Sequence, residues 1–280
     1  MKKSFVLLAI LLLSFLCCTS PGQDRKVLRI RDRQVIPFAL MVREISNTNV
    51  ILLGESHDSM ADHRAQLAVI EALHALKVPI AIGLEMFKAN SQGELDRWVG
   101  GSTPRKSFLR VYYENWTLPW PLYRGIFLYA RDNRIPMAGL NVPRKISDKV
   151  FRSGFDSLTP AEMKQIPPGI QCTVDKEYRQ FIREMYQVHD SMNDERFSNF
   201  CEAQMLWDSV MAWHVINWLN SRPGTRMVVL TGIGHAWKRG IPDQIKARSD
   251  YHFAVVLPQL PDGKQAQDIT INDADYLLLQ

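Results

Sequence analysis

Two stretches decide the fold: NVILLGESH at 49–57 and RMVVLTGIGH at 226–235. Each starts with a continuous apolar run, which is typical of a parallel strand covered on both faces. Similar runs occur at 79–84, 135–142 and 251–257, and helical patterns at 60–76 and 242–248 separate neighbouring runs. This order predicts an α/β fold with a mostly parallel central sheet flanked by helices.

The region 155–222 interrupts this alternation. Its apolar residues recur at helical spacing over 175–189 and again over 195–220. We therefore expect a small all-helical subdomain at 155–222, inserted into an α/β domain that is formed by 22–154 and 223–280. Residues 22–34 are polar and basic and are expected to form a tether.

The composition restricts the class of protein. The chain has 280 residues, of which 46% are hydrophobic and 22% charged. Such a chain can bury enough apolar surface to fold, so intrinsic disorder is excluded. The formal net charge is only +5 and no basic run occurs. We therefore expect no nucleic acid as a partner.

The N-terminus has the pattern of an export signal. Lys2 and Lys3 precede an apolar run at 5–16, which is shorter than the roughly 20 residues that span a bilayer. Residues 1–17 are therefore interpreted as a signal peptide. A lipid on Cys17 or Cys18 would anchor the protein in the bacterial cell envelope, facing the periplasm. The alternative is ordinary cleavage to a soluble exported protein.

Two further cysteines lie in the region expected to be helical. In an oxidising compartment Cys172 and Cys201 could form a disulfide. They could equally be two separate buried thiols. Neither has a CxxC partner, so a redox motif is not indicated.

Carboxylates and imidazoles follow the predicted strands. Glu55 and His57 come after the first strand, Glu85 after the second, and His235 after the fourth. Because ligands bind at the carboxyl ends of parallel strands, these side chains are expected to meet in one site. Such a set could hold a divalent metal or activate water. Taken singly, each residue could be structural.

Several motifs resemble one known family. They are the run from Val50 to His57, the Asp58/His63 pair, LEMF at 84–87, WPLY at 120–123, LNVPR at 140–144, Asp208-x-x-Met211-Ala212, and TGIGH at 231–235 followed by GIP at 240–242. In this order they resemble the ChaN haem-binding uptake lipoproteins. That family belongs to the wider group of Tiki/TraB proteins and erythromycin esterases.

The resemblance implies a function and a cofactor. ChaN-type proteins bind haem through a tyrosine, with two haems face to face at a dimer interface, and take part in iron uptake. A homodimer and a haem receptor or transporter are therefore expected as partners. The expected ligand is Tyr178 or Tyr186, with His189 nearby and with Arg179 and Arg183 for the propionates. Tyrosinate is a hard anionic ligand that suits ferric iron.

Two hypotheses remain open. We favour a haem-binding protein of the envelope. The alternative is a metal-dependent hydrolase, a protease or an esterase, because Tiki-type relatives with paired GxxH motifs are proteases. Its catalytic residues would be Glu55, His57, Glu85 and His235, of which His57, His235 and Glu85 would bind the metal.

Overall fold

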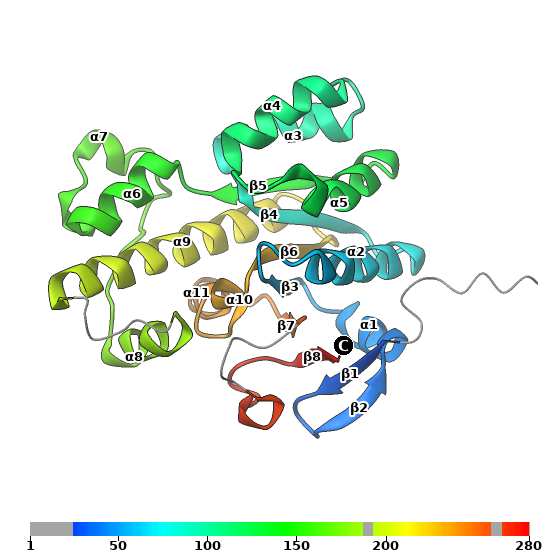
Figure 1. Ribbon diagram of the computed structural model, residues 1–280. Helices are drawn as coiled ribbons and strands as arrows, with labels where there is room; N and C mark the ends of the chain where they lie inside the picture. Colours follow the sequence, from blue (N-terminus) through cyan, green and yellow to red (C-terminus); the bar gives the residue numbers. More distant parts are fainter. Residues whose placement is uncertain (1–24, 187–192, 259–264, 280) are drawn as a thin grey trace, which may run out of the picture.

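A computed structural model describes residues 25–186, 193–258 and 265–279. It is a layered α/β protein in which one eight-stranded sheet carries helices on both faces (Figure 1). The strands are β1 (Lys26–Arg29), β2 (Gln34–Pro37), β3 (Val50–Glu55), β4 (Ile80–Lys88), β5 (Met137–Asn141), β6 (Arg226–Gly232), β7 (Phe253–Leu257) and β8 (Tyr276–Leu279).

Eleven α-helices lie in the described part of the chain. They are α1 (Phe38–Ile45), α2 (Met60–Ala75), α3 (Gln92–Val99), α4 (Arg105–Asn115), α5 (Trp120–Asp132), α6 (Arg144–Ser153), α7 (Pro160–Met163), α8 (Lys176–Met185), α9 (Asp194–Asn220), α10 (Ile233–Ala236) and α11 (Ile241–Arg248). Short 3-10 helices are η1 (Ala89–Ser91), η2 (Phe155–Ser157) and η3 (Ala266–Asp268).

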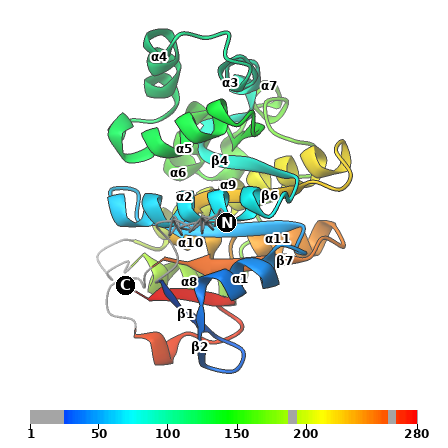
Figure 2. The ribbon, with the colours of Figure 1, turned by 90° about the vertical axis from the view of Figure 1, so that its right-hand side faces the viewer.

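The strands follow the order β2-β1-β8-β7-β3-β6-β4-β5. All pairs from β8 to β5 are parallel, and β1 pairs antiparallel with both β2 and β8. The two views place the β1–β2 hairpin at the end of the sheet opposite β4 and β5 (Figures 1 and 2). The prediction of a mostly parallel sheet flanked by helices is therefore confirmed.

The tether predicted at 22–34 is wrong in its described part. Residues Lys26–Arg29 form β1, and β2 begins at Gln34. Val27 is fully buried, and Val27 and Leu278 pair across β1 and β8. The pairing of β1 with β8 joins the two ends of the chain and produces no local sequence pattern. The polar composition of 22–34 therefore wrongly suggested a tether.

Both faces of the central strands are buried. Ile51 and Leu53 face a core beneath helices α1 to α5, whereas Val50 and Leu52 face a second core beneath α9, α10 and α11. Successive side chains of a strand point to opposite faces. A strand with helices on both sides must therefore be apolar at every position, which explains the continuous runs.

Helix α9 connects the sheet to the remaining helices. Met211 and Val215, in its second half, pack against the sheet. Its first half contributes Phe197 and Cys201 to a cluster with α8, and the middle packs against α6. The described part of 155–222 contains no strand. Because α9 serves both regions, a separate subdomain at 155–222 stays a prediction.

Several sequence-based expectations fall outside the described residues. These are the signal peptide at 1–17, the acylated Cys17 or Cys18, and His189. No helix in the described ranges is long and apolar enough to cross a membrane. Cys172 and Cys201 are both free thiols. Burial raises the pKa of the Cys201 thiol to about 11.

Candidate functional site

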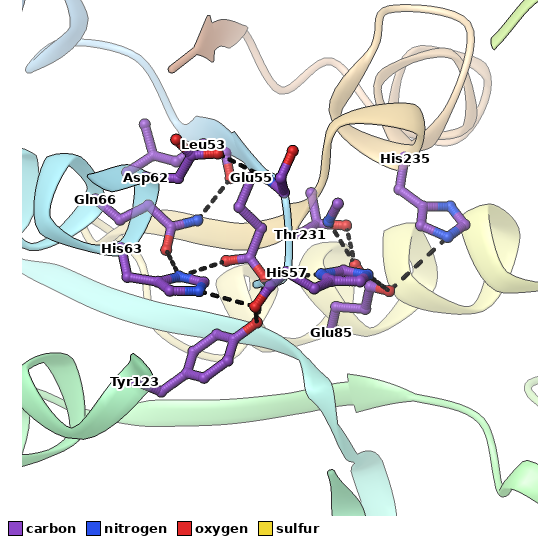
Figure 3. A network of polar contacts seen from close by, with 12 residues as sticks. Leu53, Glu55, His57, Asp62, His63, Gln66, Glu85, Tyr123, Thr231 and His235 are labelled. Carbon is purple, nitrogen blue, oxygen red and sulfur yellow. Dashed lines mark hydrogen bonds and ion pairs between the residues drawn. The ribbon is translucent and has the colours of Figure 1, made fainter. Parts of the chain in front are cut away.

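The four predicted site residues converge at one edge of the sheet (Figure 3). Glu55 ends β3, His57 lies two residues further on, and Glu85 lies in the last part of β4. His235 follows β6, on the short helix α10. The topology explains this convergence, since β6 lies between β3 and β4 and all three run in parallel.

Glu55 is the buried centre of the first half of the site. Its Oε1 accepts hydrogen bonds from the Tyr123 hydroxyl and from His57 Nδ1, the latter at 2.9 Å. Burial disfavours the charged carboxylate, but hydrogen bonds from His57 and His63 lower the pKa of Glu55 to about 2. Glu55 is therefore an ionised carboxylate inside the protein.

His63, on α2, provides a second positive charge beside Glu55. Its Nδ1 lies 3.3 Å from both Glu55 Oε2 and Gln66 Oε1, and its Nε2 lies 3.1 Å from the His57 carbonyl. The Gln66 amide cannot offer its nitrogen instead, because that nitrogen donates to the Leu53 carbonyl. Acceptors face both ring nitrogens, so His63 carries both protons and is an imidazolium.

Glu85 faces the two imidazoles of the sequence motif. Its Oε2 accepts from the Thr231 hydroxyl at 2.5 Å and from Gly232 N–H at 2.7 Å. Its Oε1 lies 3.9 Å from His57 Nε2 and 3.9 Å from His235 Nε2. These distances exceed a direct hydrogen bond and are long enough for a small polar group or water between them.

His235 is held by a carboxylate in the same way as His57. Its Nδ1 donates to Asp208 Oδ1 at 2.7 Å, and the Tyr178 hydroxyl donates to Asp208 Oδ2 at 2.9 Å. Burial lowers the pKa of His235, yet Asp208 and Glu85 raise it above the ordinary value. Asp208 lies on α9, so this helix contributes to the site as well as to the core.

The neighbouring carboxylates favour the protonated form of His57. Burial alone would lower the pKa of His57, but Glu55 and Glu85 raise it to about 9. Burial raises the pKa of the Asp208 carboxyl, although His235 and Tyr178 oppose this rise. Protonated His57 is a hydrogen-bond donor and general acid at pH 7, and it becomes a base only above its pKa.

The predicted divalent metal at His57, His235 and Glu85 is not supported. Within the described ranges, no group of three or more His, Cys, Asp or Glu side chains has the geometry of a metal site. Glu85 Oε2 is already engaged by Thr231 and Gly232.

A pocket of about 310 Å³ adjoins Glu85. Its lining comes from β4, the end of α4 and the loop after it, the end of β5, α6 and α9. Met86, Trp116, Val142 and Trp207 supply apolar and aromatic surface, and Arg144 is a strongly exposed cation on the lining. Glu85, Lys88, Glu114 and Asp148 line it too, so the pocket combines aromatic, apolar and charged surface.

The predicted haem residues lie on and around α8, where their polar atoms are engaged. The Tyr178 ring is buried and its hydroxyl donates to Asp208. Tyr186 is partly exposed, but its hydroxyl donates to Gln204 Oε1 at 2.8 Å. Arg179 donates to Ser198, and both Arg179 and Arg183 lie over the Phe197 ring.

Desolvation of the hydroxyl and the charge of Asp208 raise the pKa of Tyr178 and of Tyr186 well above the ordinary value, which opposes formation of tyrosinate. For Tyr186 this concerns the hydroxyl end, because the residue as a whole is 37% exposed. A Cβ atom at Gly234 would lie 2.5 Å from the Tyr186 hydroxyl, so glycine permits this close approach. Their role as haem ligands stays a prediction.

Sequence reasoning gave no role to several residues of the site. His63, Tyr123, Asp208 and Thr231 were noticed only within motifs, without a role of their own, and Gln66 was not singled out. The role of Thr231 could have been expected from its place directly before Gly232 at the end of β6. His63 and Asp208 are buried in helices, where nothing local distinguishes them.

Comparison with protein families identifies the chain. Residues 41–245 match the family described as "Haem-binding uptake, Tiki superfamily, ChaN". The chain belongs to the ChaN family. The match covers the sheet from β3 to β6 and every residue of the site above, so the family resemblance read from the motifs is confirmed. No curated protein matches the sequence.

Several solved structures are similar to this ChaN family member. It is similar to a structure described as cofacial heme binding to ChaN of Campylobacter jejuni, with 22% identity, a TM-score of 0.71, and coverage of 92% of this chain and 97% of that one. It is also similar to the type III effector HopBA1, with 12% identity, a TM-score of 0.50 and coverage of 85% and 89%. A third similar structure is an erythromycin esterase mutant, EreC H289N, in its open conformation. Its sequence identity is 11% and its TM-score 0.49, and the match covers 86% of this chain and 78% of the esterase chain.

Proposed function

We propose that this ChaN family member is an exported envelope protein that binds ferric haem through a tyrosine. The observation that supports the proposal is the family match over residues 41–245. The similar Campylobacter jejuni structure is described as binding heme cofacially, and it matches nearly the whole of this chain. Haem supplies a ferric iron that a hard anionic oxygen ligand can hold.

The residues of the pocket beside Glu85 fit such a ligand. A porphyrin needs an apolar slot, cations for its propionates and an oxygen ligand for ferric iron. Trp116, Trp207 and Met86 supply the apolar slot, and Arg144 supplies an exposed guanidinium. A pocket of about 310 Å³ encloses only part of a porphyrin. A second protomer could therefore cover the remaining face, in line with the proposed homodimer.

We further propose a place in the cell. The apolar run at 5–16 followed by Cys17 and Cys18 supports export and a lipid anchor in the envelope, facing the periplasm. A haem receptor or transporter would then exchange haem with the protein during iron uptake. Metabolic labelling with a fatty acid tests the anchor. Wild-type labelling that is lost in the Cys17→Ser or in the Cys18→Ser variant supports the lipid anchor. Absence of labelling in wild type would overturn it.

A haemin titration tests haem binding. Ferric haem added to the purified full-length protein should saturate at a defined stoichiometry and give the charge-transfer absorption of a ferric–phenolate complex. Sedimentation with and without haemin reports whether the protomers associate. If the absorption spectrum of haemin stays the same as that of free haemin at all protein concentrations, the proposal is refuted.

Metal-free hydrolysis of an ester or peptide is a second candidate function. The geometry that favours it is the pair of imidazoles, each held at Nδ1 by a carboxylate and each directed with Nε2 towards Glu85. His57 would act as the base, so the rate should rise with pH up to about 9. His57→Ala should abolish the activity and His252→Ala, at an exposed histidine, should not. Equal rates in both variants would exclude this role.

A further inference from the structure

We propose that a second pocket, lined by three arginines, binds a phosphate group or another doubly charged oxyanion. This pocket has a volume of about 340 Å³. Arg105, Arg131 and Arg134 line it, together with Asp132 and residues of the loop at 101–104. The inference is independent of haem binding, because it concerns a different part of the fold.

The arginine pocket lies at the opposite rim of the sheet from Glu85. The loop at 101–104 connects α3 with α4, and Arg131 lies in the last turn of α5. These three helices cover the sheet beside β4 and β5 (Figure 1). Arg134 precedes the amino end of β5, whereas Glu85 lies in the last part of β4, which runs parallel to β5. The arginine pocket is therefore a site of its own.

Two of the three guanidinium groups are held in place by the protein. The Arg131 guanidinium lies over the ring of Trp98, 4.7 Å from its centroid. Trp98 is fully buried, and its Nε1 donates to the Phe127 carbonyl, so this platform is rigid. Arg134 Nη1 donates to the Val99 carbonyl at 3.1 Å. Groups that are fixed before binding lose less conformational freedom when a ligand arrives.

The lining carries an excess of positive charge. Its three guanidinium groups face one carboxylate, that of Asp132. Arg131 donates to Asp132 Oδ1 from Nε at 2.9 Å and from Nη2 at 2.8 Å, but the Asp132 side chain is 60% exposed and the pair is therefore weak. No carboxylate of the described residues forms an ion pair with Arg105 or Arg134. A doubly charged anion would neutralise the remaining excess.

The donors of the pocket suit a phosphate group in particular. A guanidinium presents parallel N–H groups that bind two oxygens of a phosphate at once. A phosphate monoester carries a charge of roughly −1.5 to −2 at neutral pH. Gly101 keeps Arg134 accessible, since a Cβ atom there would lie 3.4 Å from Arg134 Nη1. None of the described lining residues is aromatic, so the ligand is expected to be polar.

Isothermal titration calorimetry with inorganic phosphate tests the site. The purified full-length protein at low ionic strength should bind phosphate saturably. Arg105→Ala and Arg134→Ala should each weaken binding by about five- to tenfold, as expected for a partly exposed charge-assisted hydrogen bond. Arg110→Ala is the matched control, because Arg110 is another exposed arginine of α4 that lies outside the lining. It should change the affinity by less than about twofold.

Two results would overturn the site. One is a wild-type protein that binds no phosphate. The other is an affinity that Arg105→Ala and Arg134→Ala leave unchanged or that Arg110→Ala lowers equally, which would show attraction by general charge alone. A circular dichroism melt checks folding. Arg105 forms no ion pair with a described residue, so Arg105→Ala keeps the test valid even if Arg134→Ala loosens the contact with Val99.

Vesicles distinguish the two sources of such a phosphate group. A lipid headgroup and a soluble phosphate ester present the same chemistry to the arginines. If the headgroup is the ligand, wild type should bind vesicles of phosphatidic acid more strongly than vesicles of phosphatidylcholine, and Arg105→Ala should lose this preference. If wild type binds inorganic phosphate but both kinds of vesicle equally, the pocket serves a soluble phosphate ester. Either result supports the arginine pocket and assigns its ligand.

Discussion

Replacing Glu55 by glutamine should lower the pKa of His57 and destabilise the protein. In wild type, Glu55 is buried and holds His57 Nδ1 at 2.9 Å, with His63 and Tyr123 as its other partners. Glu55→Gln removes the negative charge and keeps the shape. Burial then favours neutral His57, while Glu85 and Asp58 still favour its protonated form, so the pKa should fall from about 9 towards the ordinary 6.5.

The magnitude follows from the two pKa values of His57. The folded value of about 9 exceeds the ordinary 6.5, so the interaction stabilises the protein fully below pH 6.5 and is lost as the pH rises through 9. The difference corresponds to about 3 kcal/mol. Because the His57 side chain is 38% exposed, solvent screening reduces the expected contribution to about 1–2 kcal/mol.

Glu55→Gln should cost more than this contribution alone. It leaves the His63 imidazolium without its buried counter-ion, and breaking a buried pair in this way costs about 3–5 kcal/mol. Urea unfolding at pH 6 measures the loss. Glu94→Gln, which removes one partner of an exposed ion pair with Arg97, should change the free energy of unfolding by less than about 1 kcal/mol.

NMR titration of the histidine ring protons is the decisive assay. Wild-type His57 should titrate near pH 9 and should move to a clearly lower pH in Glu55→Gln. The free energy of unfolding of wild type should decrease between pH 6.5 and 9, and this decrease should be smaller in the variant. A wild-type His57 that titrates near 6.5 would refute the reasoning even if the variant does not fold.

Two further substitutions test the packing and the second histidine. Gly139→Ala should destabilise by about 1–3 kcal/mol through overpacking, because its Cβ would lie 2.5 Å from the Lys88 carbonyl oxygen. A Cβ atom at Gly93 in α3 would have no neighbour closer than 3.6 Å. Gly93→Ala should therefore raise the free energy of unfolding by up to about 1 kcal/mol in the same urea assay. Asp208→Asn should lower the pKa of His235 in the NMR titration, and an unchanged His235 would show that Asp208 does not govern it.

The five central strands, β3 to β7, could be predicted because their burial produces continuous apolar runs in the sequence. A strand such as β3 that is buried on both faces must be apolar throughout, and its length separates it from the helices. β1, β2 and β8 have only four residues each, and β1 lies between strands from opposite ends of the chain. Such a pairing depends on tertiary contacts that local composition does not reveal.

The candidate site was predictable where it depends on strand ends. Glu55, Glu85 and His235 were found because the carboxyl ends of parallel strands meet at one edge. The protonation of the site could not be predicted in this way. The charge of His63 depends on which atoms face its two nitrogens, including an amide whose orientation the Leu53 carbonyl fixes.

The antiparallel pairing of β1 has a consequence for how the protein would stand on a lipid bilayer. Lys26 opens β1 opposite Leu279, the last residue of β8, and β8 runs in the same direction as the strands that carry Glu55 and Glu85. The chain therefore enters the sheet at the rim where those acids lie. From Cys17 or Cys18 to Lys26 a fully extended chain reaches only about 30 Å. An acyl group on either cysteine would hold that rim close to the lipid headgroups, so that haem would be exchanged near the membrane surface.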